Sequence, residues 1–109
     1  MTVKAYTELI AWQKSIDLVT DVYGITRQFP KEEVYGLTSQ IRRAAISVPS
    51  NIAEGQGRLS TGEFRQFLGH ARGSLAEVET QIHIAEKLSY VLPEEADRLL
   101  SSAMKSGES

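Results

Sequence analysis

Two glutamates and a histidine are spaced as metal ligands or acid–base groups would be on a helix. Glu79, His83 and Glu86 stand at positions i, i+4 and i+7, so they share one helix face and could ligate a metal ion. Di-iron bundles instead use Glu-x-x-His motifs from paired helices, and the chain contains no such motif. The three residues also lie outside the apolar stripe of their segment. We therefore interpret them as a solvated, ion-pairing face and predict no metal, no cofactor and no catalytic residue.

Five arginines are the second group with ligand-binding chemistry, in this case for anions. Arg65 and Arg72 are seven residues apart and so project from one side of a helix. The predicted cationic face comprises Arg42, Arg43, Arg58, Arg65 and Arg72. Such a face neutralises phosphates and binds nucleic acid in a salt-sensitive way. The alternative is pairing with Glu54, Glu79 or Glu86 of the same or a neighbouring subunit, which the lack of an aromatic stacking platform favours.

A proline lies inside the pattern of an amphipathic helix. Pro49 removes one backbone donor and crowds the carbonyl of Ala45, at a cost of about 3 kcal/mol in a helix interior. Asn51 falls on the apolar side of the same segment, and we expect its amide to bond backbone groups that the proline leaves unpaired. A ligand or partner contact is the alternative role. The predicted structural motif comprises Pro49, Asn51, Glu54 and Gly55.

Apolar residues recur at helical spacing in four segments, and strand signals are absent. The first helix should begin near Thr7 and end at Phe29, before Pro30. Its apolar stripe is Leu9, Trp12, Ile16, Val19, Tyr23 and Thr26, and Val22, Ile25 and Phe29 should widen this face. The second should run from about Val34 or Gly36 to Ala53, with Gly55 and Gly57 as stop signals, on a stripe of Leu37, Ile41, Ala44, Val48 and Ile52.

Capping signals place the other two helices. Ser60 and Glu63 have the spacing of a capping box, and the stripe from Phe64 to Ala85 continues toward Tyr90. Pro93 suits the first turn of a fourth helix of about 13 residues. Gly69 and Gly73 should allow a close helix approach. We predict an all-α, antiparallel up-down four-helix bundle with a short fourth helix. Because the fourth helix is shorter than its partners, it should leave an apolar groove that another subunit could cover.

Length and composition agree with one domain. The 109 residues form a single predicted bundle domain, 1–109, with a core of about 7–104 and a disordered tail at 105–109. The chain has no cysteine, so disulfides and thiolate chemistry are excluded, and without a signal or membrane segment the expected location is the cytoplasm. The net charge of -2 hides segregation: residues 27–72 carry seven basic and four acidic groups, whereas residues 73–109 carry three and seven.

Several strings of residues together resemble a known family. They include Ala-Trp-Gln-Lys at 11–14, Gln-Ile-Arg-Arg-Ala at 40–44 and Ser-Val-Pro-Ser-Asn-Ile-Ala-Glu-Gly at 47–55. Over about residues 9–92 the chain resembles the four-helix-bundle proteins encoded in 23S rRNA intervening sequences. The resemblance implies a ring-like homopentamer, similar to the accessory variability determinant proteins of diversity-generating retroelements, which use a basic surface to engage nucleic acid and a reverse transcriptase. Family members usually have a longer fourth helix than this chain.

An apolar surface beyond the main stripes fits such an assembly. Phe67, Ile84 and Leu88 widen the apolar side of the third helix, and we predict that they form a subunit interface, with isolated apolar exposure as the alternative. The predicted function is a non-enzymatic, oligomeric scaffold or adaptor that binds RNA or DNA backbone through its arginines. The alternative is a protein-interaction module whose groove binds a partner helix, with no nucleic-acid role.

Overall fold

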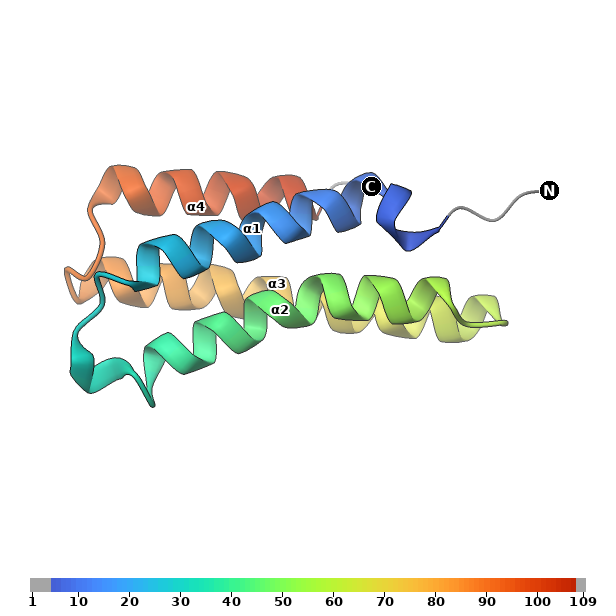
Figure 1. Ribbon diagram of the computed structural model, residues 1–109, viewed down its shortest axis with the longest axis horizontal. Helices are drawn as coiled ribbons and strands as arrows, with labels where there is room; N and C mark the ends of the chain where they lie inside the picture. The colour runs from blue at the N-terminus through green and yellow to red at the C-terminus, as the bar shows by residue number, and fades with distance from the viewer. Residues whose placement is uncertain (1–4, 108–109) are drawn as a thin grey trace.

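The computed structural model describes residues 5–107 of the chain. This part forms α-helices and short 3-10 helices, without a strand: η1 Tyr6–Glu8, α1 Ile10–Thr26, η2 Lys31–Glu33, α2 Leu37–Gln56, α3 Thr61–Lys87 and α4 Pro93–Ser106. The four α-helices run alternately up and down (Figure 1). The fourth has 14 residues against 27 in α3. The predicted all-α bundle with a short fourth helix is therefore confirmed.

The helices pack as a square, each against two neighbours. α1 lies next to α2 and α4, and α3 lies next to the same two helices, while the Cα atoms of neither diagonal pair come within 8 Å in the described chain. Figure 1 shows α1 and α4 side by side above α2 and α3. The core fills the centre of the square with fully buried side chains from several helices: Leu18, Val22, Ile41, Val48, Val78 and Ile82. Consequently two helices border each groove on the outside of the bundle.

The buried side of α1 differs from the predicted stripe. Val22 and Phe29, which were expected to widen the apolar face, are buried as predicted. Leu18, which the stripe omitted, is fully buried, whereas Ile16 is 38% exposed, so the prediction was wrong at these two positions. Ser15 and Thr26 also lie in the core, where their hydroxyls donate to backbone carbonyls of α1 at 2.7 Å. These hydrogen bonds let two polar residues occupy buried positions. The helix also begins later than expected, because the chain is extended at Leu9 after η1.

Pro49 does not interrupt α2, which is continuous from Leu37 to Gln56. Side chains next to the proline bond the helix backbone: Ser50 Oγ donates to the carbonyl of Ile46 at 2.9 Å, and Asn51 Nδ2 to that of Ser47 at 2.8 Å. Asn51 is thus a local structural residue, but its acceptor is the carbonyl of Ser47 rather than that of Ala45, which the proline leaves without its usual donor. The predicted stripe of α2 is buried or partly buried throughout.

Gly55 has a packing role and does not end α2, contrary to the prediction. It is buried inside the helix, and a Cβ added there would lie 3.0 Å from Cβ of Phe67 and 3.4 Å from the carbonyl oxygen of Phe64. The helix ends instead with Gly57 as its C-cap residue. A side chain at position 55 would therefore push α2 away from α3.

Gly69 and Gly73 do not serve a close helix approach in this chain. A Cβ added at either position would meet nothing within 4 Å among the described residues. Both glycines lie on the exposed side of α3. The predicted packing role is wrong for these two residues within one copy of the protein.

Local signals at the starts of α3 and α4 act as predicted. Ser60 Oγ accepts from the backbone amide of Glu63 at 3.1 Å, and α3 begins at Thr61, the residue after Ser60. Pro93 occupies the first turn of α4, where Glu95 Oε1 accepts from the backbone amide of Leu92 at 2.8 Å. Both carboxylates lie at the positive ends of their helices, where negative charge is favourable.

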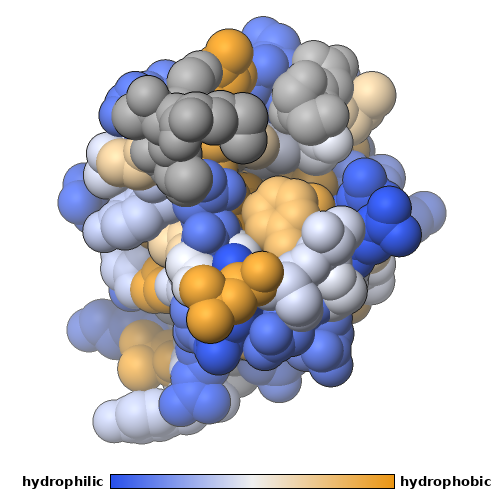
Figure 2. All heavy atoms as spheres, turned by 90° about the vertical axis from the view of Figure 1, so that its right-hand side faces the viewer, coloured by the Kyte–Doolittle hydropathy of each residue, from blue (hydrophilic) through white to orange (hydrophobic). Residues whose placement is uncertain are grey.

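The α2–α3 turn projects beyond the end of α4 (Figure 1). Figure 2 views this end of the bundle and shows apolar side chains surrounded by polar ones. Leu59 in the turn is fully exposed, and a small pocket of about 80 Å³ lies beside Leu68, Leu75 and Gly107. Lys105 and Ser106 belong to α4, so the prediction of a disordered tail from residue 105 is wrong for these two; residues 108–109 lie outside the described range.

Candidate functional site

The structure places the five predicted arginines in separate parts of the bundle. Arg42 lies in the groove between α1 and α2, where Nε donates to Thr26 Oγ1 at 2.8 Å. Its guanidinium carbon also lies 4.4 Å from the ring centroid of Tyr23. Arg43 is exposed and borders the same groove. These two arginines are brought together.

Arg58 has partners at the α2–α3 turn. Its Nη2 lies 3.4 Å from Glu54 Oε2, and its guanidinium carbon lies 4.6 Å from the ring centroid of Phe67. Arg65 and Arg72 are exposed on α3, and Arg72 borders the small pocket at the end of α4. Of the five arginines, Arg58 alone has a carboxylate within 4 Å inside the described range. The predicted pairing with Glu79 or Glu86 is therefore absent within one copy.

The residues of the predicted subunit interface have different surroundings. Ile84, in α3, is 42% exposed, and Leu88, the C-cap residue of that helix, is 49% exposed. Phe67 is only partly exposed and packs beside Arg58 and His70 near the α2–α3 turn. Phe67 and Ile84 are 17 residues apart, roughly 26 Å along a helix. Ile84 and Leu88 thus form one apolar surface, and Phe67 belongs to another part of the molecule.

A second apolar surface lies in the groove between α1 and α2, and the sequence did not reveal it. Two pockets lie along this α1–α2 groove, and Ile46 lines both of them. One of them, of about 300 Å³, is bordered mainly by Trp12, Ile16, Val19 and Pro49. Ile16 and Ile46 are 38% and 42% exposed. The surplus of apolar residues around α1 was the available signal, because a helix with apolar side chains on more than one face cannot bury them all in one core.

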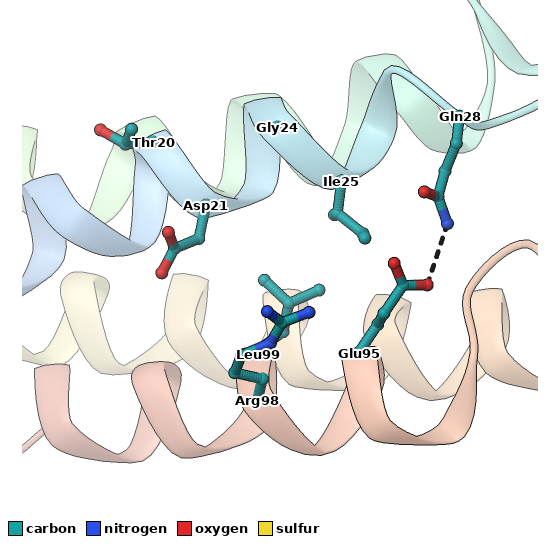
Figure 3. A pocket seen from close by; sticks show the side chains of 8 residues that line it. All are labelled: Thr20, Asp21, Gly24, Ile25, Gln28, Glu95, Arg98 and Leu99. Atoms are coloured by element: carbon teal, nitrogen blue, oxygen red, sulfur yellow. Dashed lines mark hydrogen bonds between the residues drawn. The ribbon is translucent and has the colours of Figure 1, made fainter.

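A further pocket lies between α1 and α4 (Figure 3). It has a volume of about 380 Å³ and carries Asp21, Gln28, Glu95 and Arg98 on its rim. Gln28 and Glu95 point toward one another across the gap, with Nε2 donating to Oε1 at 3.0 Å (Figure 3). Because Glu95 also caps α4, its carboxylate is committed to holding the two helices together. The pocket shows no paired nucleophile and base.

Perturbed acidities in the described chain have structural causes. Hydrogen bonds from the backbone of Leu37 and from Tyr90 hold the pKa of Glu33 below its ordinary value, and the same bond to Glu33 raises the pKa of Tyr90. The pKa of Glu95 is lowered by hydrogen bonds from the backbone of Leu92 and from Gln28. Both glutamates bond the first residues of a helix or its cap. A catalytic acid or base would instead be tuned toward its working pH.

Neither metal-binding nor membrane-spanning features occur in the described residues. Between residues 5 and 107, no group of three His, Cys, Asp or Glu side chains is arranged to hold a metal ion. Glu79 and Glu86 are partly exposed and His83 is exposed on α3. None of the helices in this range is long and apolar enough to cross a membrane.

Fold and surface together define the class of protein: a four-helix bundle with exposed apolar side chains and several exposed arginines in separate places. The chain belongs to the family of 23S rRNA-intervening sequence proteins, whose family model matches residues 7–108. The predicted family is thus confirmed. None of the curated proteins matches the chain.

A solved structure has the same fold. It is a protein of unknown function from the S23 ribosomal protein family of Bacteroides thetaiotaomicron, with a TM-score of 0.83 and 17% sequence identity. The match covers 90% of this chain and 92% of that one. At this identity the likeness shows the fold and carries no activity with it.

Proposed function

We propose that the protein is a non-enzymatic, self-associating scaffold or adaptor. The observation that carries this proposal is the presence of two separate groups of exposed apolar residues. One is the α1–α2 groove around Ile16 and Ile46, and the other is the C-terminal end of α3 with Ile84 and the C-cap residue Leu88. Different surfaces on one chain can pair head to tail, and repeated pairing closes into a ring when the rotation allows it. A homopentamer, which the family resemblance implies, is the assembly that we propose.

Solution mass tests the assembly. Light scattering on the eluting protein should give the mass of five copies of the 12.1 kDa chain. Ile84→Glu and Leu88→Glu each place a charge in the proposed contact and should shift the mass toward one copy. His83→Glu introduces the same side chain at an exposed neighbouring position and should leave the mass unchanged. A monomeric wild-type protein at high concentration would refute the scaffold proposal.

The proposed ligand of the scaffold is the phosphate backbone of RNA or DNA. Arg42, Arg43, Arg65 and Arg72 have no carboxylate within 4 Å in the described chain, so their charges are available to phosphates. A ring would repeat this set in every copy and multiply a weak contact. We propose the cytoplasm as the location, in keeping with a chain that contains no cysteine.

Salt-dependent titration tests this ligand. The oligomer is titrated into labelled structured RNA and matched DNA over a range of salt concentrations. Each arginine that contacts a phosphate should contribute about one unit to the slope of log affinity against log salt. Arg65→Ala and Arg72→Ala should flatten the slope, whereas Arg27→Ala, an exposed arginine outside the set, should not. Absence of binding at low salt would contradict the nucleic-acid role.

A protein partner is the second candidate, and the α1–α2 groove favours it. Apolar side chains that include Trp12, Val19 and Pro49 line the groove, which suits the apolar face of an amphipathic helix. A single copurifying polypeptide that is lost on Ile46→Glu, while nucleic-acid binding is absent, would support this candidate over the first.

A further inference from the structure

Arg42 is held in one orientation before any ligand arrives. Its Nε donates to Thr26 Oγ1 at 2.8 Å, and Thr26 is itself buried and fixed by its donation to the carbonyl of Val22 at 2.7 Å. The guanidinium also stacks over Tyr23, 4.4 Å from the ring centroid. Two contacts with α1 therefore set both the position and the plane of this guanidinium.

The terminal amino groups of Arg42 have no acceptor in the described chain. Arg42 contacts α1 through Nε and through the face of the guanidinium. The N–H groups of Nη1 and Nη2 therefore have no hydrogen-bond partner among residues 5–107. These groups form the end of the arginine fork that binds carboxylate or phosphate in a bidentate manner. Ordering the side chain in advance lowers the cost of binding such a ligand.

The surrounding pocket contains groups that suit a phosphate. It has a volume of about 260 Å³, and no carboxylate is among its lining residues. The polar residues Arg42, Arg43, Thr38 and Ser39 line it together with Tyr23, Val34 and Ile46. Thr38 is 7% exposed, and its hydroxyl oxygen is buried without a hydrogen-bond partner. The nearby carboxylate of Glu33 is directed elsewhere, to the backbone amide of Leu37 and the hydroxyl of Tyr90.

We propose that this pocket binds one phosphate group, with the Arg42 fork as its main ligand and Arg43 and Ser39 beside it. A tetrahedral phosphate offers several acceptor oxygens to donors on different sides, which matches two arginines and hydroxyls better than a planar carboxylate does. The inference deepens the proposed function, because it names the arginine that would hold a backbone phosphate at a defined position. Arg65 and Arg72 would then contribute charge without a built pocket.

Titration with small anions tests the pocket directly. ¹⁵N-labelled protein is titrated with inorganic phosphate, and then with dimethyl phosphate and acetate, which carry the same single charge. Saturable shifts of the Arg42 Nε–H signal and of the Thr38 and Ser39 amides are expected, with dimethyl phosphate binding more tightly than acetate. Arg42→Lys keeps the charge but removes the fork, and should weaken binding about tenfold or more. Arg27→Lys is the matched control and should bind as wild type.

Variants of Thr26 separate orientation from charge. Thr26→Val leaves Arg42 in place but removes its anchor, and should weaken phosphate binding by about two- to tenfold. Thr26→Ser retains the hydroxyl and should restore the wild-type affinity. Near-ultraviolet circular dichroism checks that each variant keeps its tertiary structure, and Arg42→Lys decides the proposal if Thr26→Val does not fold.

Specific outcomes overturn this proposal or the proposed function separately. Wild-type affinity for phosphate in Arg42→Lys would overturn the pocket, since only diffuse charge would then be acting. Equal affinity for acetate and dimethyl phosphate would also overturn it and indicate a carboxylate from a protein partner. Phosphate binding at Arg42 without any RNA or DNA binding would support the pocket and refute the nucleic-acid function. RNA binding that depends on Arg65 and Arg72 but not on Arg42 would support the nucleic-acid function and refute the pocket.

Discussion

Tyr90 donates its hydroxyl to Glu33 Oε2 at 2.8 Å, across 57 positions of the sequence. The other oxygen of this carboxylate, Oε1, accepts from the backbone amide of Leu37 at 3.0 Å. The ring of Tyr90 also lies against Phe29, with 5.4 Å between the ring centroids. One carboxylate therefore joins the start of α2 to the connection between α3 and α4.

Acid should weaken this junction. Because the pKa of Glu33 is lower in the folded protein than its ordinary value of 4.5, its contribution to stability is complete above that value and is lost as the pH falls through the folded pKa. Glu33→Gln should therefore show a smaller loss of stability below pH 4.5 than wild type. Urea unfolding midpoints over a pH series measure this difference. Glu32→Gln, at the adjacent exposed carboxylate, should behave as wild type.

Alkali should act on the same junction through Tyr90. The pKa of Tyr90 is raised above 10.0 by its hydrogen bond to Glu33, so its contribution to stability is present below that value and is lost as the pH rises through the folded pKa. Tyr90→Phe should remove this alkaline loss. Unfolding midpoints measured near and above pH 10.0 test the effect, and an unchanged alkaline profile would contradict it.

Gly55 should tolerate no branched side chain. Gly55→Val places atoms against Phe64 and Phe67, and overpacking of this kind costs about 1–3 kcal/mol. Chemical denaturation gives the change in the free energy of unfolding. The same substitution at Gly69, where an added Cβ meets nothing within 4 Å, should cost much less. Gly69→Ala should stabilise the protein by up to about 1 kcal/mol through its helix propensity.

The hydroxyls of Ser47 and Ser74 should be energetically coupled. Ser74 Oγ donates to Ser47 Oγ at 2.8 Å, linking α3 to α2, and Asn51 Nδ2 donates to the same oxygen at 2.9 Å. Ser74→Ala should cost about 1 kcal/mol, and Ser47→Ala more, because it removes the acceptor of both bonds. A double-mutant cycle should give a coupling energy of about 0.5–1.5 kcal/mol. Strict additivity would show that the bond does not contribute to stability.

Alanine substitutions should distinguish the two sides of α1. Leu18 is fully buried, and Leu18→Ala should destabilise the protein by about 2–5 kcal/mol. Ile16 is 38% exposed in the α1–α2 groove, so Ile16→Ala should cost clearly less. Thermal and urea unfolding measure both variants. Equal losses would mean that the core follows the stripe expected from spacing instead of the buried side seen in the structure.

Predictions from sequence succeeded where the deciding contacts are local. Ser60 caps α3 and Pro93 starts α4 as expected, because capping depends on residues within one turn. The spacing of apolar residues also identified the buried side of α2, since its other positions are mostly polar. In α1 the same method chose Ile16 and omitted Leu18, because both residues are apolar and spacing alone does not choose between the faces that they occupy.

The candidate site was predictable as residue types but not as an arrangement. The five arginines were identified, yet only the structure shows that Arg42 is anchored by Thr26, 16 positions earlier, and that Arg58 pairs with Glu54. Gly55 was expected to stop a helix, since glycine near a helix end commonly does so. Its packing against Phe67 depends on where α3 lies relative to α2.

The sequence by itself determined four helices, their capping residues and the family of the protein. Those features follow from hydrogen bonds and side-chain spacings within a few residues of one another, which any short segment carries. The tertiary structure alone decided which face of α1 is buried, that Ile16 and Ile46 border a groove, and that Arg42 is anchored by Thr26. Such contacts depend on how whole helices are rotated and aligned against each other, and the packing of the complete core sets that alignment.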